Sequence, residues 1–282
     1  MNQLVIVLLY VLLAPLLGGL LAGLDRKITA RMQGRFGPPI LQPFYDVLKL
    51  VQKEERRVNN LQNFYIYNFL FFIVFTGALF FLGDDMLLVI FALTLASIFL
   101  VLAAYATNSP FSNIGAEREL IQMMAYEPMM LMMAMGMYLS TGSFIIREIA
   151  DFGRPLMIYL PGIFVGYLFI LTIKFRKSPF DLSMSHHAHQ EIVKGLTTEF
   201  TGKTLAAIEV AHWYENVYLL GFVYLFFANS PAVGVIVALA AYFAEILIDN
   251  CSARFKWQFA MKSTWVVTIL VGLTNILVIY LA

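Results

Sequence analysis

Cysteine is almost absent from this chain, since Cys251 is the only one among 282 residues. One thiol cannot form an internal disulfide, and an iron–sulfur cluster requires several thiolate ligands. Any such redox centre must therefore belong to another chain. Charge is scarce as well, because Asp, Glu, Lys and Arg make up 13% of the residues and sum to +1. This balance predicts no nucleic-acid partner.

Hydrophobic residues, by contrast, make up 60% of the chain, and the mean hydropathy is +0.77. A soluble domain cannot bury that much apolar surface, so the composition predicts an all-α, polytopic membrane protein with one transmembrane domain over residues 1–282. A membrane-spanning helix needs about 20 apolar residues. Eight such segments are found, at 2–24, 64–82, 87–107, 118–140, 157–173, 204–228, 231–248 and 264–281.

Lys and Arg are distributed unequally between the two sets of loops. All of them lie in loops 25–63, 106–120, 174–203 and 249–263, except Arg147 and Arg154. The positive-inside rule therefore predicts that these four loops are cytoplasmic and that both termini lie outside. The first segment is followed directly by Asp25, Arg26 and Lys27 and lacks a basic leader, so we expect a retained helix, not a signal peptide.

The first long loop, 25–63, combines a turn with an amphipathic segment. Gly and Pro residues at 34, 37, 38 and 39 predict a defined turn, and Pro43 suits the first turn of a helix. Apolar residues at helical spacing (Phe44, Val47, Leu48 and Val51) oppose the charged Asp46, Lys49 and Lys53. The pattern predicts an interfacial helix over 43–55. The alternative is an ordinary basic loop that only sets the topology.

Acidic residues lie inside or at the edges of the apolar segments. They are Glu117, Glu119, Glu127, Glu209, Glu215, Glu245 and Asp249. Ionisable groups at membrane depth are costly, so each is a functional hypothesis. Glu127 precedes Pro128, which cannot donate a backbone hydrogen bond, and a broken helix there would admit water. We expect these acids to form one relay for protons or other ions.

Segment 204–228 adds a histidine to this set. Glu209, His212 and Glu215 are three residues apart and share one side of a helix, where they could pass protons. The alternative is hydrogen bonding between helices without transport. A di-iron site is disfavoured, because the E-x-x-H pattern has no second copy.

Loop 174–203 is densely polar, and its stretch from Ser178 to Gly202 is the most unusual in the chain. Its candidate coupling residues are Asp181, His186, His187, His189, Glu191 and Glu199. The histidines suggest zinc, but the only cysteine lies in another loop, so we expect no metal bound by this chain. Methionines crowd residues 123–137, where soft packing is a better explanation than copper binding.

Two motifs carry a resemblance to a known family. The first loop contains Arg26-Lys27, then Q-G-R-F-G-P at 33–38 and L-Q-P-F-Y-D at 41–46. The second long loop contains P-F-D-L at 179–182 and E-I-V-K-G-L-T-T-E-F-T-G at 191–202. Both resemble the H subunit of bacterial respiratory complex I, as do A-Y-E at 125–127 and G-A-E-R at 115–118. The resemblance covers essentially the whole chain, and the family's eight membrane spans agree with the eight apolar segments found here.

Two departures favour one branch of that family. The S-M-S-H-H-A-H-Q stretch replaces the short acidic run that follows P-F-D-L in complex I, and the segment between Pro38 and Leu41 is shorter. The histidine-rich form resembles the B membrane subunit of Ech-type energy-converting [NiFe] hydrogenases. That resemblance implies an enzyme subunit of the prokaryotic inner membrane, without a redox centre of its own, that couples hydrogen evolution to proton or sodium transport.

The resemblance also implies partners and roles. Large and small hydrogenase subunits would carry the nickel–iron centre and iron–sulfur clusters, ferredoxin would act indirectly, and an antiporter-like subunit and membrane lipid would adjoin the chain. The soluble arm would dock on a set of mostly basic residues, namely Arg26, Lys27, Arg31, Arg35, Asp46 and Lys49. Two alternatives stay open: the quinone-binding H subunit of a complex I, and a passive membrane anchor.

Overall fold

The computed structural model describes residues 3–55, 59–184 and 192–281. These residues form helices joined by loops, and within these ranges no β-strand occurs, only two isolated backbone bridges. The all-α prediction is therefore confirmed. The predicted coupling residues His186, His187, His189 and Glu191 lie outside the described residues.

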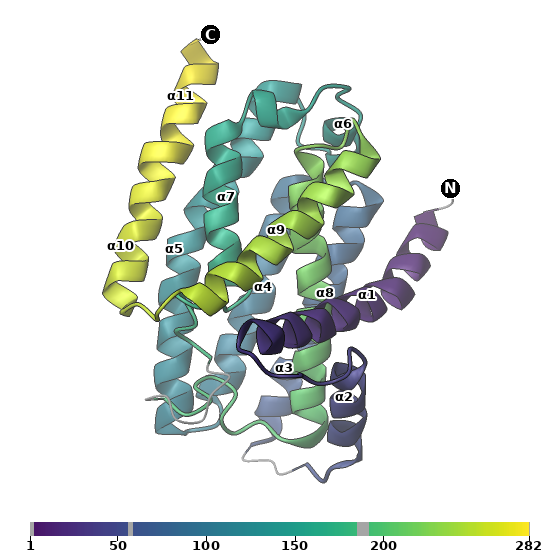
Figure 1. Cartoon of the computed structure of the whole chain (residues 1–282), viewed down its shortest axis with the longest axis vertical. Helices are drawn as coiled ribbons and strands as arrows, with labels where there is room; N and C mark the ends of the chain where they lie inside the picture. Colours follow the sequence, from purple (N-terminus) through teal and green to yellow (C-terminus); the bar gives the residue numbers. More distant parts are fainter. Residues whose placement is uncertain (1–2, 56–58, 185–191, 282) are drawn as a thin grey trace. The chain divides into compact units, whose positions relative to one another are not determined.

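The helices follow the order predicted from the hydrophobic pattern (Figure 1). They are α1 (Gln3–Met32), α2 (Gln42–Gln52), α3 (Asn60–Leu82), α4 (Met86–Tyr105), α5 (Pro110–Thr141), α6 (Ile146–Ala150), the short 3₁₀ helix η1 (Leu156–Ile158), α7 (Pro161–Lys174), α8 (Gly202–Leu225), α9 (Pro231–Cys251), α10 (Trp257–Val267), the π-helical turn η2 (Thr268–Leu273) and α11 (Thr274–Leu281). Each of the eight predicted apolar segments overlaps helical structure, and the predicted segment 43–55 overlaps α2, which ends three residues earlier, at Gln52.

Several helices extend further than predicted. Helix α1 continues through Asp25, Arg26 and Lys27 to Met32, and α5 begins at Pro110, inside the predicted loop 106–120. Helices α3 and α10 also begin before the predicted residues 64 and 264. The prediction was wrong there because hydropathy measures the apolar length, whereas charged residues such as Lys and Arg are good helix formers outside it. The break expected at Pro128 is also absent, since α5 stays helical through that residue.

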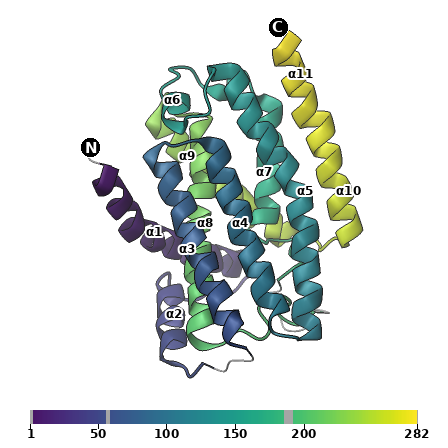
Figure 2. The same cartoon turned by 180° about the vertical axis from the view of Figure 1, so that it is seen from behind.

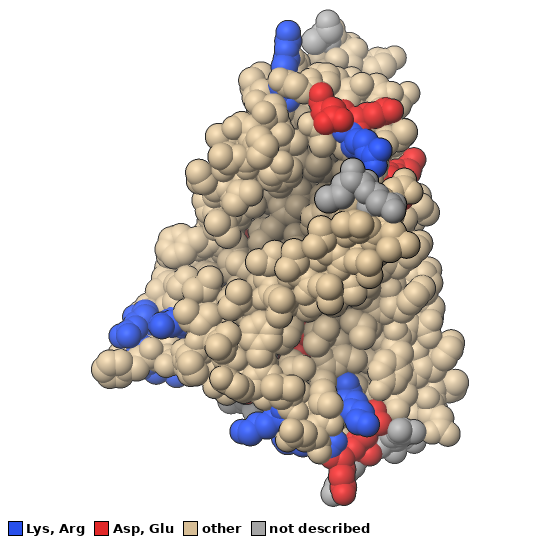
Figure 3. Space-filling model, turned by 90° about the vertical axis from the view of Figure 1, so that its right-hand side faces the viewer, with Lys and Arg blue, Asp and Glu red and all other residues tan. Residues whose placement is uncertain are grey.

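Five helical stretches are long and apolar enough to cross a membrane, within the part of the chain that the structure describes. They are α1, α3, α4, α9 and the stretch Trp257–Leu281, which comprises α10, η2 and α11. Helix α7 is apolar but has only 14 residues. Helices α5 and α8 carry the acids that lower their mean hydropathy. On the face shown in Figure 3, most of the surface carries no Lys, Arg, Asp or Glu.

Polar side chains within the apolar helices bond to their own backbone. The Thr76 hydroxyl donates to the carbonyl of Phe72 at 2.7 Å, and the Thr264 hydroxyl donates to the carbonyl of Ala260, also at 2.7 Å. Such bonds to the residue four positions earlier satisfy a hydroxyl where no water is present. Helical structure therefore accommodates these hydroxyl groups in apolar surroundings.

The described contacts group the chain into two compact units. Unit 1 comprises Met1–Ala78, Ala92–Leu120 and Asp181–Val217, and unit 2 comprises Leu79–Phe91, Ile121–Phe180 and Tyr218–Ala282. Within unit 1, α1 lies obliquely against α8 (Figure 1), and Gly18 of α1 directly faces the backbone of Trp213. A Cβ at Gly18 would overlap that backbone, so glycine permits the close approach typical of membrane helices.

Within unit 2, the C-terminal helices lie alongside α7 (Figures 1 and 2). The side-chain oxygen of Asn275 accepts hydrogen bonds from the backbone N–H groups of Gly162 and Ile163, at 2.9 and 3.1 Å. These are among the first N–H groups of α7, which have no partner in their own helix. Asn275 therefore caps α7 from a neighbouring helix and fixes the position of α11.

Candidate functional site

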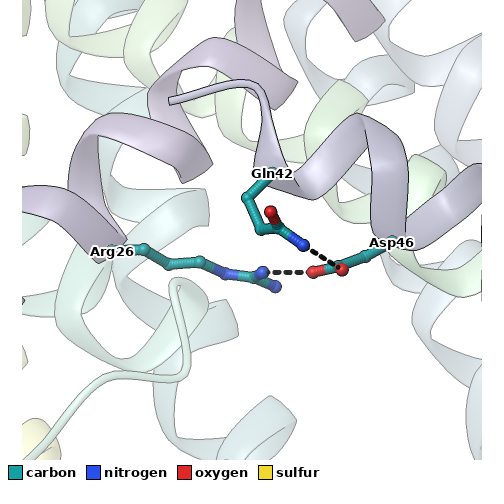
Figure 4. A network of polar contacts seen from close by, with 3 residues as sticks. All are labelled: Arg26, Gln42 and Asp46. Atoms are coloured by element: carbon teal, nitrogen blue, oxygen red, sulfur yellow. Dashed lines mark hydrogen bonds and ion pairs between the residues drawn. The ribbon is translucent and has the colours of Figure 1, made fainter. Parts of the chain in front are cut away.

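The first loop of unit 1 folds back onto α1. The turn expected at Gly34–Pro39 is present, with positive φ angles at Gly34 and Gly37, and Pro43 lies in the first turn of α2. The Arg26 guanidinium donates to one carboxylate oxygen of Asp46 at 2.6 Å, and the Gln42 amide donates to the other at 2.9 Å (Figure 4). These contacts join α2 to the C-terminal part of α1, which the positive-inside rule predicts to be cytoplasmic.

Most of the residues predicted to dock a soluble arm are on the surface. Arg26, Arg31, Arg35 and Lys49 are exposed, whereas Lys27 is half-buried. The Arg31 guanidinium lies 5.3 Å from the centre of the exposed Phe36 ring, which is a cation–π distance. The arrangement is accessible to a partner, and the docking role stays a prediction.

The apolar residues of α2 face two directions. The half-buried Phe44 ring lies 5.1 Å from the Trp213 ring and packs against Gly19, so it faces α1 and α8. The exposed apolar side chains are Leu41, Tyr45, Leu48 and Val51. Phe44 was grouped with Leu48 and Val51 by helical spacing but contacts protein, because sequence periodicity cannot distinguish a face that contacts protein from one that contacts lipid.

We expect the Arg26–Asp46 pair to stabilise α2 modestly and in a pH-dependent way. Partial burial tends to raise the pKa of Asp46, but hydrogen bonds from Arg26 and Gln42 and the nearby positive charges outweigh it and lower that pKa. Because the pKa of Asp46 is lower in the folded chain, the stabilisation is complete at pH values above the pKa of Asp in the unfolded chain, about 3.9. It is lost as the pH falls through the pKa of Asp46 in the folded chain.

The side chains of Arg26 and Asp46 are 45% and 38% exposed, so Arg26→Gln should destabilise α2 by less than about 1 kcal/mol. Hydrogen exchange of residues 42–52 at neutral pH should therefore increase slightly in that variant, and the difference from the parent should vanish in acid. Arg31→Gln is the matched control, since Arg31 contacts Phe36 instead. Equal exchange of the parent and Arg26→Gln at neutral pH would contradict the prediction.

The predicted relay residues of unit 1 differ in burial. On α8, Glu215 is 2% exposed, whereas Glu209 and His212 are half-buried. The His212 ring lies 6.1 Å from the ring of Phe69 on α3, edge to face. On α5, Glu119 is buried and Glu117 is exposed. Buried carboxylates are therefore present on both helices, and their relay role stays a prediction.

The described parts of the predicted coupling loop pack against α5 in unit 1. The backbone N–H of Leu196 donates to the carbonyl of Ser183 at 3.0 Å, which joins the two described segments of the loop. Gly115 of α5 lies directly against the backbone of Gly195 and Leu196. Asp181 is buried, and Glu199 is half-buried. Only glycine fits at position 115, because the backbone of the loop lies in direct contact with the backbone of α5 there.

In unit 2, α5 and α7 bring Lys174 to Tyr126, the residue that precedes the predicted acid Glu127. The Lys174 ammonium donates to the Tyr126 hydroxyl at 3.1 Å and lies 4.3 Å from the centre of its ring. The neighbouring Glu127 is half-buried, and its Oε1 atom is buried without a hydrogen-bond partner among the described residues. A carboxylate oxygen in this position would be satisfied by a proton or by water.

Helix α9 of unit 2 carries the last two predicted relay residues. Glu245 is 2% exposed and interacts electrostatically with Lys177 and Asp249. The half-buried Asp249 accepts a hydrogen bond at 2.9 Å from the backbone N–H of Ser178. The structure thus brings Glu245 and Asp249 together and joins them to the segment that follows α7.

Three buried cations were missed by the sequence analysis, which treated them only as indicators of topology. Lys174, Arg176 and Lys177 are each nearly fully buried at the end of α7. Arg176 has a positive φ of 52°, which turns the chain sharply after the helix. Pro179, three residues after Arg176, is a sequence signal for a turn after α7.

The described residues contain no group of three or more His, Cys, Asp or Glu side chains placed to hold a metal ion. The methionines that crowd α5 pack against glycines of unit 2: Met129 lies against Gly166 of α7 and against Gly272 of η2. Soft side chains thus fill the space beside close helix contacts.

Comparison with known proteins gives consistent matches over nearly the whole chain. A family model described as NADH dehydrogenase matches residues 3–280. The chain is 27% identical to hydrogenase-4 component C of Escherichia coli, over 86% of this chain and 85% of that protein. It is 29% identical to the H subunit of NADH-quinone oxidoreductase of Protochlamydia amoebophila, over 90% of this chain and 89% of that protein.

Two further matches come from archaea. The chain is 28% identical to the H subunit of F(420)H(2) dehydrogenase of Methanosarcina acetivorans, over 83% of this chain and 78% of that protein. A chain in the structure of the membrane-bound sulfane sulfur reductase, an archaeal respiratory membrane complex, superposes with a TM-score of 0.87. That match covers 99% of this chain and 100% of the other at 24% identity, and it establishes a common fold.

Proposed function

This chain is a member of the NADH dehydrogenase family, and from that membership we propose that it is the ion-translocating and anchoring membrane subunit of an energy-converting [NiFe] hydrogenase. Its relatives include subunits of multisubunit oxidoreductases, one of them hydrogenase-4 component C. The observation that favours the hydrogenase branch is the S-H-H-A-H-Q-E stretch at 185–191 of the sequence. In this proposal the partners carry out the redox chemistry.

The ion-translocating part of the proposal rests on the buried carboxylates. Glu119 and Glu215 are buried in unit 1, and Glu245 is buried in unit 2. A buried acid that can exchange its proton is suited to a relay, because burial and neighbouring charges set when it ionises. We propose that the three acids, together with Glu127 and Glu209, transfer the coupling ion while partner subunits evolve hydrogen.

The membrane arrangement follows from the same proposal. All eight predicted segments would cross the membrane, including the acidic helices α5 and α8, whose polar side chains would face protein instead of lipid. Helix α2 would lie at the interface, with the exposed Leu41, Tyr45, Leu48 and Val51 toward lipid. The basic loops would be cytoplasmic and both termini outside.

A second candidate function is that of a quinone-binding H subunit. The observation in its favour is that several relatives are H subunits of NADH-quinone oxidoreductases, of which three match 90% of this chain. In that case the loop that contains Asp181 and Glu199 would adjoin a quinone instead of acting only as a coupling element. A passive anchor is the third alternative, and it requires no exchange of protons at the buried acids.

Metal analysis of the intact complex, purified in mild detergent through a tag on this chain, distinguishes the first two functions. The hydrogenase proposal predicts nickel near one atom per complex with iron in excess, and hydrogen evolution from reduced ferredoxin. Iron without nickel, together with extractable quinone, would overturn it in favour of the quinone-binding function. The same preparation, placed in vesicles, provides the assay for ion transport.

A further inference from the structure

The helical stretch Trp257–Leu281 has two unlike sides. Small residues recur at every fourth position on its buried side, namely Ala260, Thr264, Thr268 and Gly272. The stretch packs against α7 (Figures 1 and 2), and Gly272 lies directly against the sulfur atom of Met129. Close packing between membrane helices relies on small residues of this kind. The small side is therefore the one that contacts the rest of unit 2.

The opposite side of this stretch, here called the outer side, is bulky, apolar and exposed. Its side chains include Phe259, Val266, Ile269, Leu270, Leu273 and Leu277. Interfaces between membrane helices are enriched in small residues, so these bulky positions suit acyl chains better than a second helix. From residue 262 to residue 273 a helix rises about 17 Å. One leaflet of the hydrocarbon core is about 15 Å deep, so one phospholipid has the length to cover the outer side.

Charge is present only near the start of this stretch, and all of it is positive. After Asp249 the sequence contains Arg254, Lys256 and Lys262 and no Asp or Glu. The side chains of Lys256 and Lys262 are exposed, and neither forms an ion pair with a described residue. Residues 256, 259 and 262 are three apart, so the two lysines lie on either side of Phe259 along the outer side. Two positive charges thus lie at one end of an apolar surface.

Aromatic side chains surround the lysines, and a backbone contact fixes the segment that carries Lys256. The backbone N–H of Phe255 donates to the carbonyl of Pro179 at 3.0 Å, and the Phe255 ring lies 4.7 Å from the Phe259 ring. Phe255, Trp257 and Phe259 nevertheless keep 42%, 38% and 52% of their surface exposed. Exposed aromatic rings beside basic side chains are typical of the headgroup level of a membrane.

We propose that Lys256 and Lys262 form a binding site for the headgroup of an anionic phospholipid, whose acyl chains lie along the outer side. Lysines next to a membrane attract anionic headgroups. A soluble anion would gain nothing from the aromatic and apolar side chains beside them. The inference rests on the membrane embedding in the proposed function, but it requires neither ion transport nor nickel. In the predicted orientation, the lipid belongs to the cytoplasmic leaflet.

The test identifies the lipid that contacts this stretch in the intact purified complex, placed in nanodiscs of phosphatidylcholine. Two photoreactive probes carry the same diazirine in one acyl chain, and their headgroups are phosphatidylglycerol and phosphatidylcholine. Mass spectrometry then measures the labelling of residues 257–273 by each probe. Each lysine should favour the anionic probe about fivefold, so together they should favour it roughly twentyfold. The exposed Val235, Ile236 and Leu239 of α9 are far from any Lys or Arg in the sequence and should be labelled equally by both probes.

Variants assign the preference to the two lysines. Lys256→Gln and Lys262→Gln should each lower it about fivefold, and the double variant should lose it. Replacing both lysines by arginine keeps the charges and should keep the preference. The matched control is the double variant Lys53→Gln and Lys203→Gln, which removes two exposed lysines from other loops predicted to be cytoplasmic. That control should retain the parental preference at residues 257–273.

Salt provides a second measurement if the neutral double variant does not assemble. Raising the ionic strength from about 0.1 M to about 1 M shortens the screening length from about 10 Å to about 3 Å, so the preference of the parent should disappear. Equal labelling of residues 257–273 by both probes in the parent at low salt would overturn the inference. An equal loss of preference in the control variant would also overturn it, because general surface charge would then be responsible.

A third outcome identifies a different occupant. If neither probe labels residues 257–273 while both label α9, another protein covers the outer side and the inference is overturned. Because labelling is measured without redox turnover, its result is separate from that of the proposed function. A complex without nickel would overturn the hydrogenase proposal and leave the lipid site standing, whereas a nickel-containing complex without the lipid preference would do the reverse.

Discussion

Glu215→Gln is expected to reduce ion transport by the assembled complex by more than about tenfold, the largest effect that we expect at any acid of unit 1. Glutamine has nearly the size of glutamate and retains polar atoms, but it cannot bind and release a proton. Because Glu215 is 2% exposed, water has little access to it and cannot easily take over its role. The loss should be seen as reduced ion uptake by vesicles that contain the variant complex during redox turnover.

The control variants for Glu215→Gln change acids that are exposed instead of buried. Glu148→Gln changes an exposed acid on α6 outside the proposed relay and should transport like the parent. Glu117→Gln should lose less than Glu215→Gln, since Glu117 is exposed on α5 and water can substitute for its carboxylate. A Glu215→Gln complex that assembles and transports ions at the parental rate would refute the relay in unit 1 and favour the passive anchor.

Gly115→Val is expected to uncouple redox turnover from ion transport. Any side chain at position 115 would overlap the backbone of Gly195 and Leu196, so valine must displace the described end of the coupling loop from α5. Overpacking of this kind typically costs about 1–3 kcal/mol. If the loop transmits the redox change to the acids, ions transported per turnover should fall by about tenfold, while the complex remains assembled.

Two variants and one structural measurement accompany Gly115→Val. Gly115→Ala adds a smaller group and should show an intermediate loss, whereas Ile114→Ala removes an exposed apolar side chain and should be neutral. Hydrogen exchange of residues 192–200 should increase in Gly115→Val, in proportion to the displacement of the loop. A displaced loop with an unchanged ratio of ions to turnover would show that this segment does not couple the two processes.

Local sequence chemistry determined the secondary structure of this protein. The eight apolar segments are largely helical because apolar runs in lipid must satisfy their backbone groups internally. Gly34 and Gly37 supplied the positive φ angles of the first turn, and Pro43 lies in the first turn of α2. The predicted boundaries at residues 24 and 118 were wrong, because hydropathy reports apolar length, whereas the helices extend to Met32 and from Pro110.

The sequence also identified the acidic residues, but only the tertiary structure decided which of them are buried. Helical spacing places Glu209, His212 and Glu215 on one side of α8 without indicating which side meets protein. In a membrane protein both the lipid-facing and the protein-facing sides are apolar, so no amphipathic pattern distinguishes the buried Glu119 from the exposed Glu117. Their difference follows from the packing of neighbouring segments of unit 1.

Lys177 is a second case in which the sequence identified a charged residue and only the tertiary structure decided its surroundings. Its sequence position, in a basic loop after an apolar helix, predicted the orientation of that loop and nothing about its burial. The surroundings are set by the turn after α7 and by the hydrogen bond from Ser178 to Asp249, which joins residues 71 positions apart. Sequence patterns report neighbours within a helix, whereas the burial of Lys177 depends on segments that only the folded chain brings together.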